Sequence, residues 1–437
     1  MTDVHKTAIY NARQKLLRSL QNKLSKLDIS SSLSEIKNYI LNFPSERAIL
    51  DTLYATMLND IGKTSAARGI AKIIIDTDKK LYQYAKSYLN LEPIVNTTWM
   101  LTRFGEMIDQ TAHISHQIKL GQIKKKPILP ILDQSIICNK AFIPYLHDNF
   151  SILYPGEEAD YFSRYSMISP INTTFVKYSN NVYGHYSDAA PGIHQILSKE
   201  SLPHFAFNLK DETKQIAEEY LKSFGLNNND TFVTLHLRES GFVDGNRHNW
   251  RNNELNEHLE AIKYLLNQGI KVVRIGHSKM QRAPSINGLI DLTSLNRPPE
   301  VDIYVCGACL FYYGNPSGPY SMSYQFGVPM FFTNLFPYTH ARPNTLNQII
   351  PMIDTKSSKK LKLSELYERD ISNVFAPEPY KRQGIEIGHI TPDENVSGVK
   401  EMLDKLSKLK NNPDESILDK TGLPNNIWIT EQSKQLI

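Results

Sequence analysis

Between residues 211 and 335, helical patterns alternate with short apolar runs, and this alternation limits the fold more than any other feature. An amphipathic helix predicted at about 211–224 precedes the run TFVTLHLRES at 231–240. A second helix at 254–268 precedes IKVVRIG at 270–276. Adjacent parallel strands need a long crossover connection, which is usually a helix. The segment is therefore predicted to be an α/β domain with helices packed on a parallel sheet.

The rest of this block follows the same order. Asn253 stands directly before the helix at 254–268 and is predicted to be its N-cap, since asparagine is a favoured capping residue. The later elements are a short helix at 300–307, a strand at 309–313, a helix at about 319–326 and a last clear strand, VPMFFTN.

A shorter alternation precedes it. TTWMLTRFGEM contains a short apolar run, and the helical pattern MIDQTAHISHQIKLG follows. KKPILPILD is a predicted strand with prolines at its margins, and KAFIPYLHDNF is a predicted helix. Residues 155–200 are rich in Tyr, Ser, Asn and Pro, which is typical of loops that carry binding surface. We therefore predict two facing α/β domains: a first block, or half, at 96–210 and a second at 211–355.

Residues 1–95 are predicted to form an all-helical extension. Leucines recur at helical spacing from Leu16 to Leu27 with basic residues around them, and the small residues near Gly62 resemble a tetratricopeptide-like pair. The extension is either a cap on the next domain or a module that docks to a partner protein or to anionic lipid. Residues 356–437 are predicted to be a polar tail with a helix that packs back.

The composition is that of a soluble globular protein with more than one domain. With 437 residues, the chain is too long for one ordinary core, and 41% of its residues are hydrophobic, as is usual in globular proteins. Its net charge of +4 suits an anionic small molecule and is too small to predict a nucleic-acid partner. Three cysteines, no signal segment and no membrane-length apolar run favour a cytoplasmic protein. Peripheral attachment to the inner face of the membrane is the alternative.

Polar side chains gather where the predicted strands of the second block end. Ligands of open parallel sheets bind beyond the carboxyl ends of the strands, so these side chains should converge. They are His236 and Arg238, Arg274 and His277, Asn334, and Ser317 and Ser321. A cation facing a helix N-terminus suits a diphosphate. The alternative is that Arg238 pairs inside the fold with Glu239 or Asp302.

The sequence indicates no metal site. The Asp-Thr-Asp run at 76–78 has the spelling of a metal-binding acid pair, but it lies at the end of a predicted helix in the extension. Cys306 and Cys309 are predicted to be small buried hydrophobic side chains, because a zinc site needs a second pair and only Cys138 remains. We therefore predict no metal and no cofactor.

Several motifs resemble those of the fucosyltransferase superfamily, which includes protein O-fucosyltransferases and α1,6-fucosyltransferases. HLRES is similar to its His-x-Arg motif, TRFGEM to its Arg-Phe-Gly-Asn motif, and YYGNPSGPYSMSYQFG to the loop and helix that hold the nucleotide diphosphate. A closer resemblance, to bacterial glycosyltransferases from surface-polysaccharide loci, lies in TLHLRES, VVRIG, DIYVCGACLFYYGNPSG, FGVP and FTN in this order. The resemblance spans roughly residues 97–340 and implies a GT-B-type pair of Rossmann-like domains.

The resemblance also implies roles for individual residues. Arg238 would grip the diphosphate of a nucleotide sugar, and His236 would hold the loop or a phosphate. The start of a phosphate-binding helix would be formed by Ser317, Gly318 and Ser321.

The general base stays open among several acids. Glu106 stands where the eukaryotic enzymes have asparagine, and a carboxylate there could deprotonate an acceptor hydroxyl. It could equally be a helix N-terminal glutamate stabilised by the macrodipole. Glu239 and Asp244 are rival bases, because they follow the strand end that carries Arg238.

Acceptor contacts are predicted in two places. Arg103 and Gly105 of TRFGEM are assigned to the acceptor side. Trp250 lies in the polar loop GNRHNWRNN, and its aromatic face suits a pyranose or a nucleobase. A flexible polar loop with no such contact is the alternative.

These features favour a metal-independent glycosyltransferase. It would move a sugar from a nucleotide-diphosphate donor, bound mainly by residues 231–335, to a glycan or lipid-linked acceptor bound largely by residues 97–200. The fucosyltransferase resemblance favours a GDP-sugar. The resemblance to bacterial enzymes of surface-polysaccharide loci favours surface-polysaccharide or glycoconjugate synthesis as the setting. The alternatives are a transferase that uses a CMP-linked sugar and a non-catalytic nucleotide- or glycan-binding scaffold.

Overall fold

The structure, a computed structural model, describes both α/β blocks and most of the C-terminal segment. The described residues are 93–96, 100–166, 169, 171–172, 175–179, 182–185, 193, 196–197, 199–202, 204–239, 251–336, 341–369, 371, 377–411 and 427–437. The predicted helical extension lies outside them up to residue 92, and so do the acid run at 76–78, Asp244 and Trp250.

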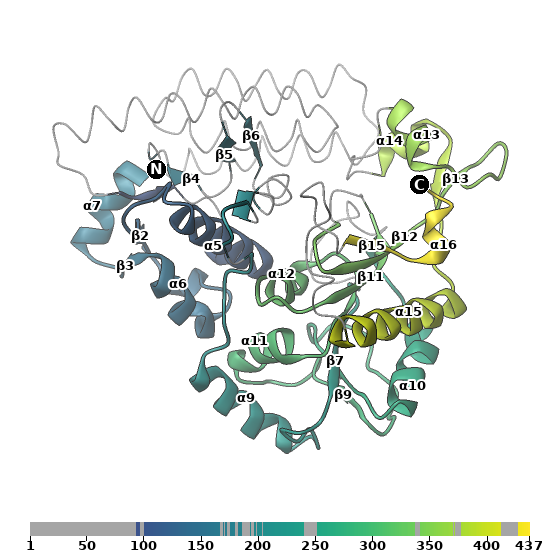
Figure 1. Cartoon of the computed structure of the whole chain (residues 1–437). Helices are drawn as coiled ribbons and strands as arrows, with labels where there is room; N and C mark the ends of the chain where they lie inside the picture. Colours follow the sequence, from purple (N-terminus) through teal and green to yellow (C-terminus); the bar gives the residue numbers. More distant parts are fainter. Residues whose placement is uncertain are drawn as a thin grey trace.

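A parallel sheet of seven strands dominates the second block (Figure 1). Its strands are β7 (Phe232–His236), β8 (Lys271–Arg274), β9 (Leu289–Asp291), β10 (Tyr312–Gly314), β11 (Met330–Leu335), β12 (Thr345–Ile349) and β15 (Ile427–Ile429). They lie in the order β15-β12-β11-β10-β7-β8-β9, and every neighbouring pair is parallel. Counted along the chain, this is the 3-2-1-4-5-6 order of a doubly wound sheet, with β15 added at the edge. The order reverses between β7 and β10, which is the topological switch point.

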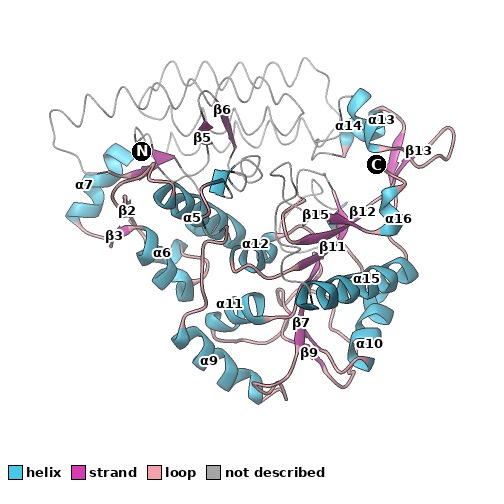
Figure 2. Cartoon of the chain, in the orientation of Figure 1, coloured by secondary structure: helices cyan, strands magenta, loops and turns pink. Residues whose placement is uncertain are grey.

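Helices cover both faces of this sheet (Figure 2). The helices α9 (Asp211–Lys222) and α11 (Pro299–Ala308) pack on one face, and α10 (Leu259–Asn267) and α15 (Pro392–Asn411) pack on the other. Phe232 of β7 belongs to the core with α9 and α11, whereas Val233 and Leu235 belong to the core with α10 and α15. The run TFVTL is apolar throughout because both of its faces are buried.

One strand was not predicted, and one predicted helix cap is wrong. The strand β12 was not predicted, because Thr345, Asn347 and Gln348 are polar, although each is at most 1% exposed. Asn253 is not the N-cap of α10, because a 3-10 helix at Leu255–His258 separates it from that helix.

The first block holds a smaller parallel arrangement. The strand β1 (Val95–Asn96) pairs with β4 (Ile171–Asn172), β2 (Ile128–Pro130) pairs with β3 (Ser151–Leu153), and a parallel bridge joins Ile94 to Ile128. The helices are α5 (Phe104–Lys119), α6 (Ile143–Asn149) and α7 (Glu157–Ser166). The segment predicted to be loop-rich contains α7 and an antiparallel pair, β5 (Phe175–Ser179) and β6 (Val182–His185), so that prediction is wrong there. The prediction of an α/β fold built on a large parallel sheet is confirmed.

The two halves share one continuous apolar core. Met107 of α5 and Phe142, just before α6, are fully buried in the same cluster as Val301 of α11 and Met322 of α12 (Gly318–Gln325). Figure 1 shows α5 and α12 packed together where the first half meets the second. A helix from each half therefore contributes to one junction.

The C-terminal segment returns to the second half. The strands β13 (Met352–Asp354) and β14 (Ile385–Ile387) form an antiparallel pair, accompanied by α13 (Leu363–Glu368) and α14 (Glu378–Arg382). Val399 and Met402 of α15 are fully buried in the core over the sheet, and α16 (Glu431–Lys434) follows β15. No helix in the described part of the chain is long and apolar enough to cross a membrane.

Candidate functional site

The carboxyl ends of β7 and β10 lie side by side at the switch point. Gly314 stands opposite His236 in the register of the two strands. A Cβ on Gly314 would lie 2.1 Å from the carbonyl oxygen of His236, so only glycine lets β10 pass this close. The loops at 237–239 and 315–317 therefore leave the sheet from one place, which is the crevice where doubly wound sheets bind ligands.

Arg238 is fixed at this crevice by three asparagines. Its backbone N–H donates to Asn315 Oδ1 at 2.9 Å, and its carbonyl accepts from the Asn253 N–H at 2.8 Å. Its guanidinium Nη1 donates to Asn252 Oδ1. Two of these contacts come from amide side chains and the third from a backbone N–H, so all three position the arginine through uncharged groups.

A second arginine lies beside Arg238. Arg251 donates from Nη2 to the carbonyl of Pro316, and its own carbonyl accepts from Asn315 Nδ2 at 2.5 Å. Burial, and after it the charge of Arg238, lowers the pKa of Arg251 to about 10. Two neighbouring cations that have lost part of their solvation favour an anion with more than one charge between them.

The helix α12 begins at the end of the same loop. Ser317 is its N-cap residue in an extended conformation, and its buried hydroxyl makes no capping hydrogen bond. Pro319 has no N–H, so the Ser317 hydroxyl and the Gly318 amide are the donors that this end of the helix offers. The partial positive charge of the helix N-terminus adds to that of the arginines.

The first turn of α5 meets the first turn of α12. A Cβ on Gly105 would lie 2.9 Å from Gly318 Cα and 3.2 Å from its carbonyl oxygen, so the two glycines permit this approach. Glu106 is the acid in the first turn of α5, and its Oε2 accepts from Gln110 Nε2 at 2.8 Å. Arg103 precedes the helix as its N-cap residue and is exposed. The N-termini of two helices thus meet, and Glu106 is in the first turn of one of them.

Ser321 lies one turn further along α12 and bonds to the other half. Its Oγ donates to Asp109 Oδ2 on α5 at 2.7 Å, and the serine is 2% exposed. A phosphate would have to displace this hydrogen bond to reach the hydroxyl. The geometry therefore favours a role for Ser321 as a link between the two helices. It argues against the predicted role, in which Ser321 would contact the phosphate of the sugar donor.

Arg274 and Glu239 pair with each other. Arg274 is 0% exposed, and its guanidinium donates to Glu239 Oε1 at 2.6 Å and to Asp291 Oδ2 at 3.0 Å. The other oxygen of Glu239 accepts from the Gln281 N–H at 2.7 Å. The geometry argues against Arg274 as a donor ligand, because its charge is already matched. It also argues against Glu239 as the base and against Glu239 as the tether of Arg238.

The loop after β8 is held by His236 and Arg297. His236 Nδ1 hydrogen-bonds to the carbonyl of Ile275 at 3.1 Å, and burial lowers the pKa of this histidine to about 4. The ring is therefore neutral at pH 7 and positions the loop without adding charge to the crevice. Arg297 Nε donates to Asp302 at 2.8 Å, so the other acid considered for Arg238 is engaged by a different arginine.

His277 and Asn334 lie near the ends of β8 and β11. His277 Nδ1 accepts from the Lys279 N–H at 3.2 Å, and burial is the main cause that lowers the pKa of this histidine. Asn334 has a positive φ of 52° and donates from Nδ2 to Asn253 Oδ1. Because Asn253 donates to the carbonyl of Arg238, Asn334 supports the arginine loop from β11, which lies beyond β10 in the sheet.

The structure brings part of the predicted set together and adds to it. The residues that adjoin the crevice or the helix junction are Arg238, Ser317, Gly318, Gly105 and Glu106. Sequence reasoning missed Arg251 and Asn315. Arg251 stands in a loop that was recognised only as polar, and its basic side chain soon after the arginine strand was the available signal. Asn315 lies inside GNPSG, where only the serine and the second glycine were predicted to contact phosphate.

Among the residues that the structure describes, no three His, Cys, Asp or Glu side chains form a cluster that could hold a metal ion. Cys306 and Cys309 are buried free thiols in the core around α11, as predicted. Their role there is packing.

Comparison with known proteins gives distant structural likeness. No protein-family model and no curated protein sequence matches the chain. A family 9 glycosyl transferase from Veillonella parvula is 14% identical, with a TM-score of 0.37 over 73% of this chain and 97% of that one. The ADP-heptose LPS heptosyltransferase II of E. coli is 11% identical, with a TM-score of 0.32 over 77% and 96%. The iron-containing dodecameric glycosyltransferase TibC of enterotoxigenic E. coli is 12% identical, with a TM-score of 0.36 over 73% and 78%. Likeness this distant does not identify an activity, which has to be inferred from the site.

Proposed function

We propose that the protein is a glycosyltransferase that uses a nucleotide-diphosphate sugar. The observation that carries this proposal is the pair Arg238 and Arg251, held by amide side chains at the switch point of a Rossmann-ordered sheet beside the N-terminus of α12. Donors and positive charges that are already in place stabilise developing negative charge most effectively. A leaving diphosphate develops such charge.

In the proposed reaction, the bond between the sugar C1 and the diphosphate oxygen breaks while the acceptor oxygen bonds to C1. Arg238 and Arg251 take up the charge that develops on the diphosphate, and the Ser317 hydroxyl and Gly318 amide donate to its oxygens. Glu106, in the first turn of α5 beside Gly318, takes the proton of the acceptor hydroxyl.

The other predicted residues are proposed to act through these. The loops at the crevice are positioned by His236, His277 and Asn334, and by the buried pair of Arg274 and Glu239. Gly105 allows the close approach of the two helices. The exposed Arg103, at the start of α5, is proposed to contact the acceptor.

The donor and setting are proposed from the sequence resemblance. It favours a GDP-sugar as donor, a glycan or lipid-linked acceptor, and surface-polysaccharide or glycoconjugate synthesis in the cytoplasm or at the inner face of the membrane. No metal is invoked, because Arg238 and Arg251 supply positive charge where a divalent ion would otherwise act.

A nucleotide panel tests the proposal. Thermal unfolding is followed with GDP, UDP, dTDP, ADP and CMP, with and without a chelator, and nucleotide sugars are then assayed for released nucleotide. A diphosphate that stabilises the fold, with turnover of its sugar, supports the proposal. Preference for CMP would favour the CMP-sugar alternative, and binding without turnover would favour the scaffold. Loss of turnover with chelator would contradict metal independence, and no binding at all would overturn the proposal.

A further inference from the structure

Asp109 is an acid in the junction of α5 and α12 that the proposed reaction does not use. It lies one helical turn beyond Glu106, and its Oδ2 accepts from Ser321 Oγ at 2.7 Å. Ser321 in turn lies one helical turn beyond Gly318. The hydrogen bond therefore ties together the two helices whose first turns Gly105 and Gly318 bring into contact.

Charged and titratable groups from three elements face Asp109. Among the residues that the structure describes, they are Glu106 on α5, Tyr320 and Tyr324 on α12, and Arg342 on the segment before β12, with the amide of Gln325 alongside. Burial raises the pKa of Asp109 to about 6, while the hydrogen bond from Ser321 and the charge of Arg342 act in the opposite direction. The negative charge of Glu106 adds to the rise. The carboxyl therefore changes its charge within the pH range in which catalytic groups commonly titrate.

Ionised Asp109 lowers the stability of the fold. Its pKa in the folded protein lies above its usual value, so its contribution to stability is complete below that usual value and is lost as the pH rises through about 6. An asparagine would keep an acceptor for Ser321 without this loss. Acids that oppose stability in this way are typical of functional sites, where local rules are broken for the sake of activity.

We propose that Asp109 is a positioning residue, which as a carboxylate holds Ser321 and so sets the first turn of α12 against Glu106. This inference rests on the proposed function, because it concerns the geometry of that site. Protonation gives Ser321 a weaker acceptor and removes the attraction between Asp109 and Arg342. The groups that hydrogen-bond to the diphosphate and the general base are then held less firmly relative to each other, and the rate of sugar transfer falls.

Asp109→Asn tests this directly, because asparagine imitates the protonated acid. The variant should show kcat/KM for the donor sugar about tenfold below wild type at pH 8, since small misplacements at a reacting site reduce rates strongly. The fall in rate that we expect for wild type as the pH drops through about 6 should be absent in this variant. Ser321→Ala removes the hydroxyl through which Asp109 acts, so it should also transfer sugar more slowly than wild type at pH 8, and the fall near pH 6 should again be absent. A role of Asp109 in packing alone would lower rates and leave the fall in place in both variants.

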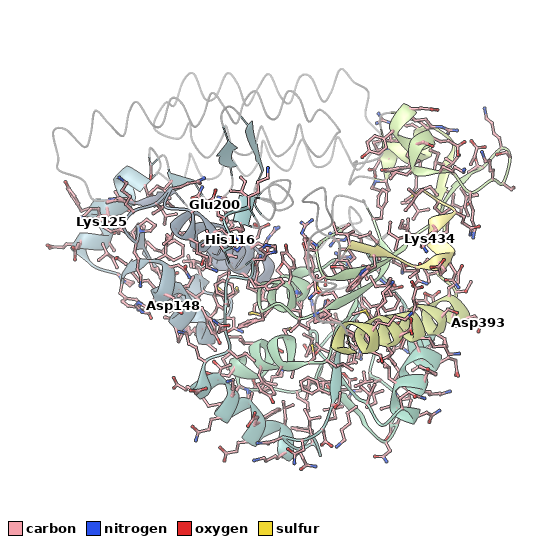
Figure 3. The ribbon with its side chains drawn as sticks, in the orientation of Figure 1. His116, Lys125, Asp148, Glu200, Asp393 and Lys434 are labelled. Atoms are coloured by element: carbon pink, nitrogen blue, oxygen red, sulfur yellow. The ribbon has the colours of Figure 1, made fainter. Side chains whose placement is uncertain are left out.

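Thermal unfolding between pH 5 and 8 supplies a readout that does not depend on activity. Asp109→Asn should unfold at a higher temperature than wild type at pH 8 and lose this advantage towards pH 5. Asp393→Asn is the matched control, because Asp393 is exposed at the outer end of α15, away from α12 (Figure 3), and it should alter neither profile.

The outcomes separate this inference from the proposed function. If wild-type protein transfers no sugar from any donor, both are overturned. If it transfers sugar while Asp109→Asn keeps the wild-type pH profile, or is less stable than wild type at pH 8, the inference about Asp109 alone is overturned.

Discussion

The contact between Gly105 and Gly318 offers a demanding test of the proposed site. Gly105→Ala would place a Cβ 2.9 Å from Gly318 Cα and 3.2 Å from its carbonyl oxygen. Ordinary van der Waals contact begins at 3.4 Å, which leaves a deficit of about half an ångström at the nearer atom. Both neighbours are backbone atoms, so the deficit can be relieved only if α5 and α12 move apart.

A separation of this size should affect catalysis more than folding. Overpacking costs about 1–3 kcal/mol of unfolding free energy. Alanine recovers up to about 1 kcal/mol of this, because it forms helices better than glycine. The variant should therefore stay folded. Displacement of catalytic groups by up to 1 Å can reduce rates by about 100-fold, so kcat should fall at least about tenfold.

Steady-state rates and thermal unfolding, measured on the same preparations, separate the two effects. Gly156→Ala is the matched control, because a Cβ there would meet only the carbonyl oxygen of Tyr154, at 3.9 Å, and its rate should equal that of wild type. Gly318→Ala should be milder than Gly105→Ala, because its Cβ would lie 3.3 Å from Gly105 N. Wild-type kcat in Gly105→Ala would refute the reasoning that the two first turns must touch for the site to work.

Three further predictions concern the crevice. Arg251→Lys keeps the charge but loses the planar guanidinium fork, so the Kd of a nucleoside diphosphate, measured by calorimetry, should rise about fivefold; an unchanged Kd would remove Arg251 from the site. Asn315→Ala leaves the Arg238 N–H and the Arg251 carbonyl without this partner, so denaturant titration should show a loss of about 1–3 kcal/mol together with slower turnover. Retained stability and turnover would show that Asn315 does not hold the arginines. Glu239→Gln removes one of two carboxylates from buried Arg274 and should cost about 2–3 kcal/mol of unfolding free energy. Lost turnover with full stability would instead identify Glu239 as a base.

The sheet was predictable where its strands are apolar on both faces. TFVTLHLRES and IKVVRIG correspond to β7 and β8, because strands buried by helices on either side need apolar residues at every position. The strand β12 was not predictable on this basis. Its buried Asn347 donates to the carbonyl of Trp428, and Gln348 to that of Glu394, so partners from the C-terminal segment satisfy its polar side chains. A local pattern does not contain these partners.

The site was predictable to the extent that topology fixes it. Strand ends that converge identified Arg238, but the same reasoning selected Arg274, whose partner Asp291 lies 17 positions later on the next strand. Spacing along the chain does not show which strand-end arginine is paired with buried carboxylates, as Arg274 is. Ser321 was assigned to phosphate for a similar reason, since its acceptor Asp109 is 212 positions away.

Binding of a nucleoside diphosphate tests the central claim most directly. Isothermal titration with the tightest-binding diphosphate of the panel compares wild type, Arg238→Ala and, as a control, Lys125→Ala, whose exposed side chain lies at the outer edge of the first half (Figure 3). The diphosphate is predicted to bind Arg238→Ala about 10- to 100-fold more weakly than wild type, because hydrogen bonds to charged groups contribute about 1.5–3 kcal/mol. Lys125→Ala is predicted to bind it as wild type does. Equal affinity in wild type and Arg238→Ala would contradict the claim that this crevice binds the diphosphate.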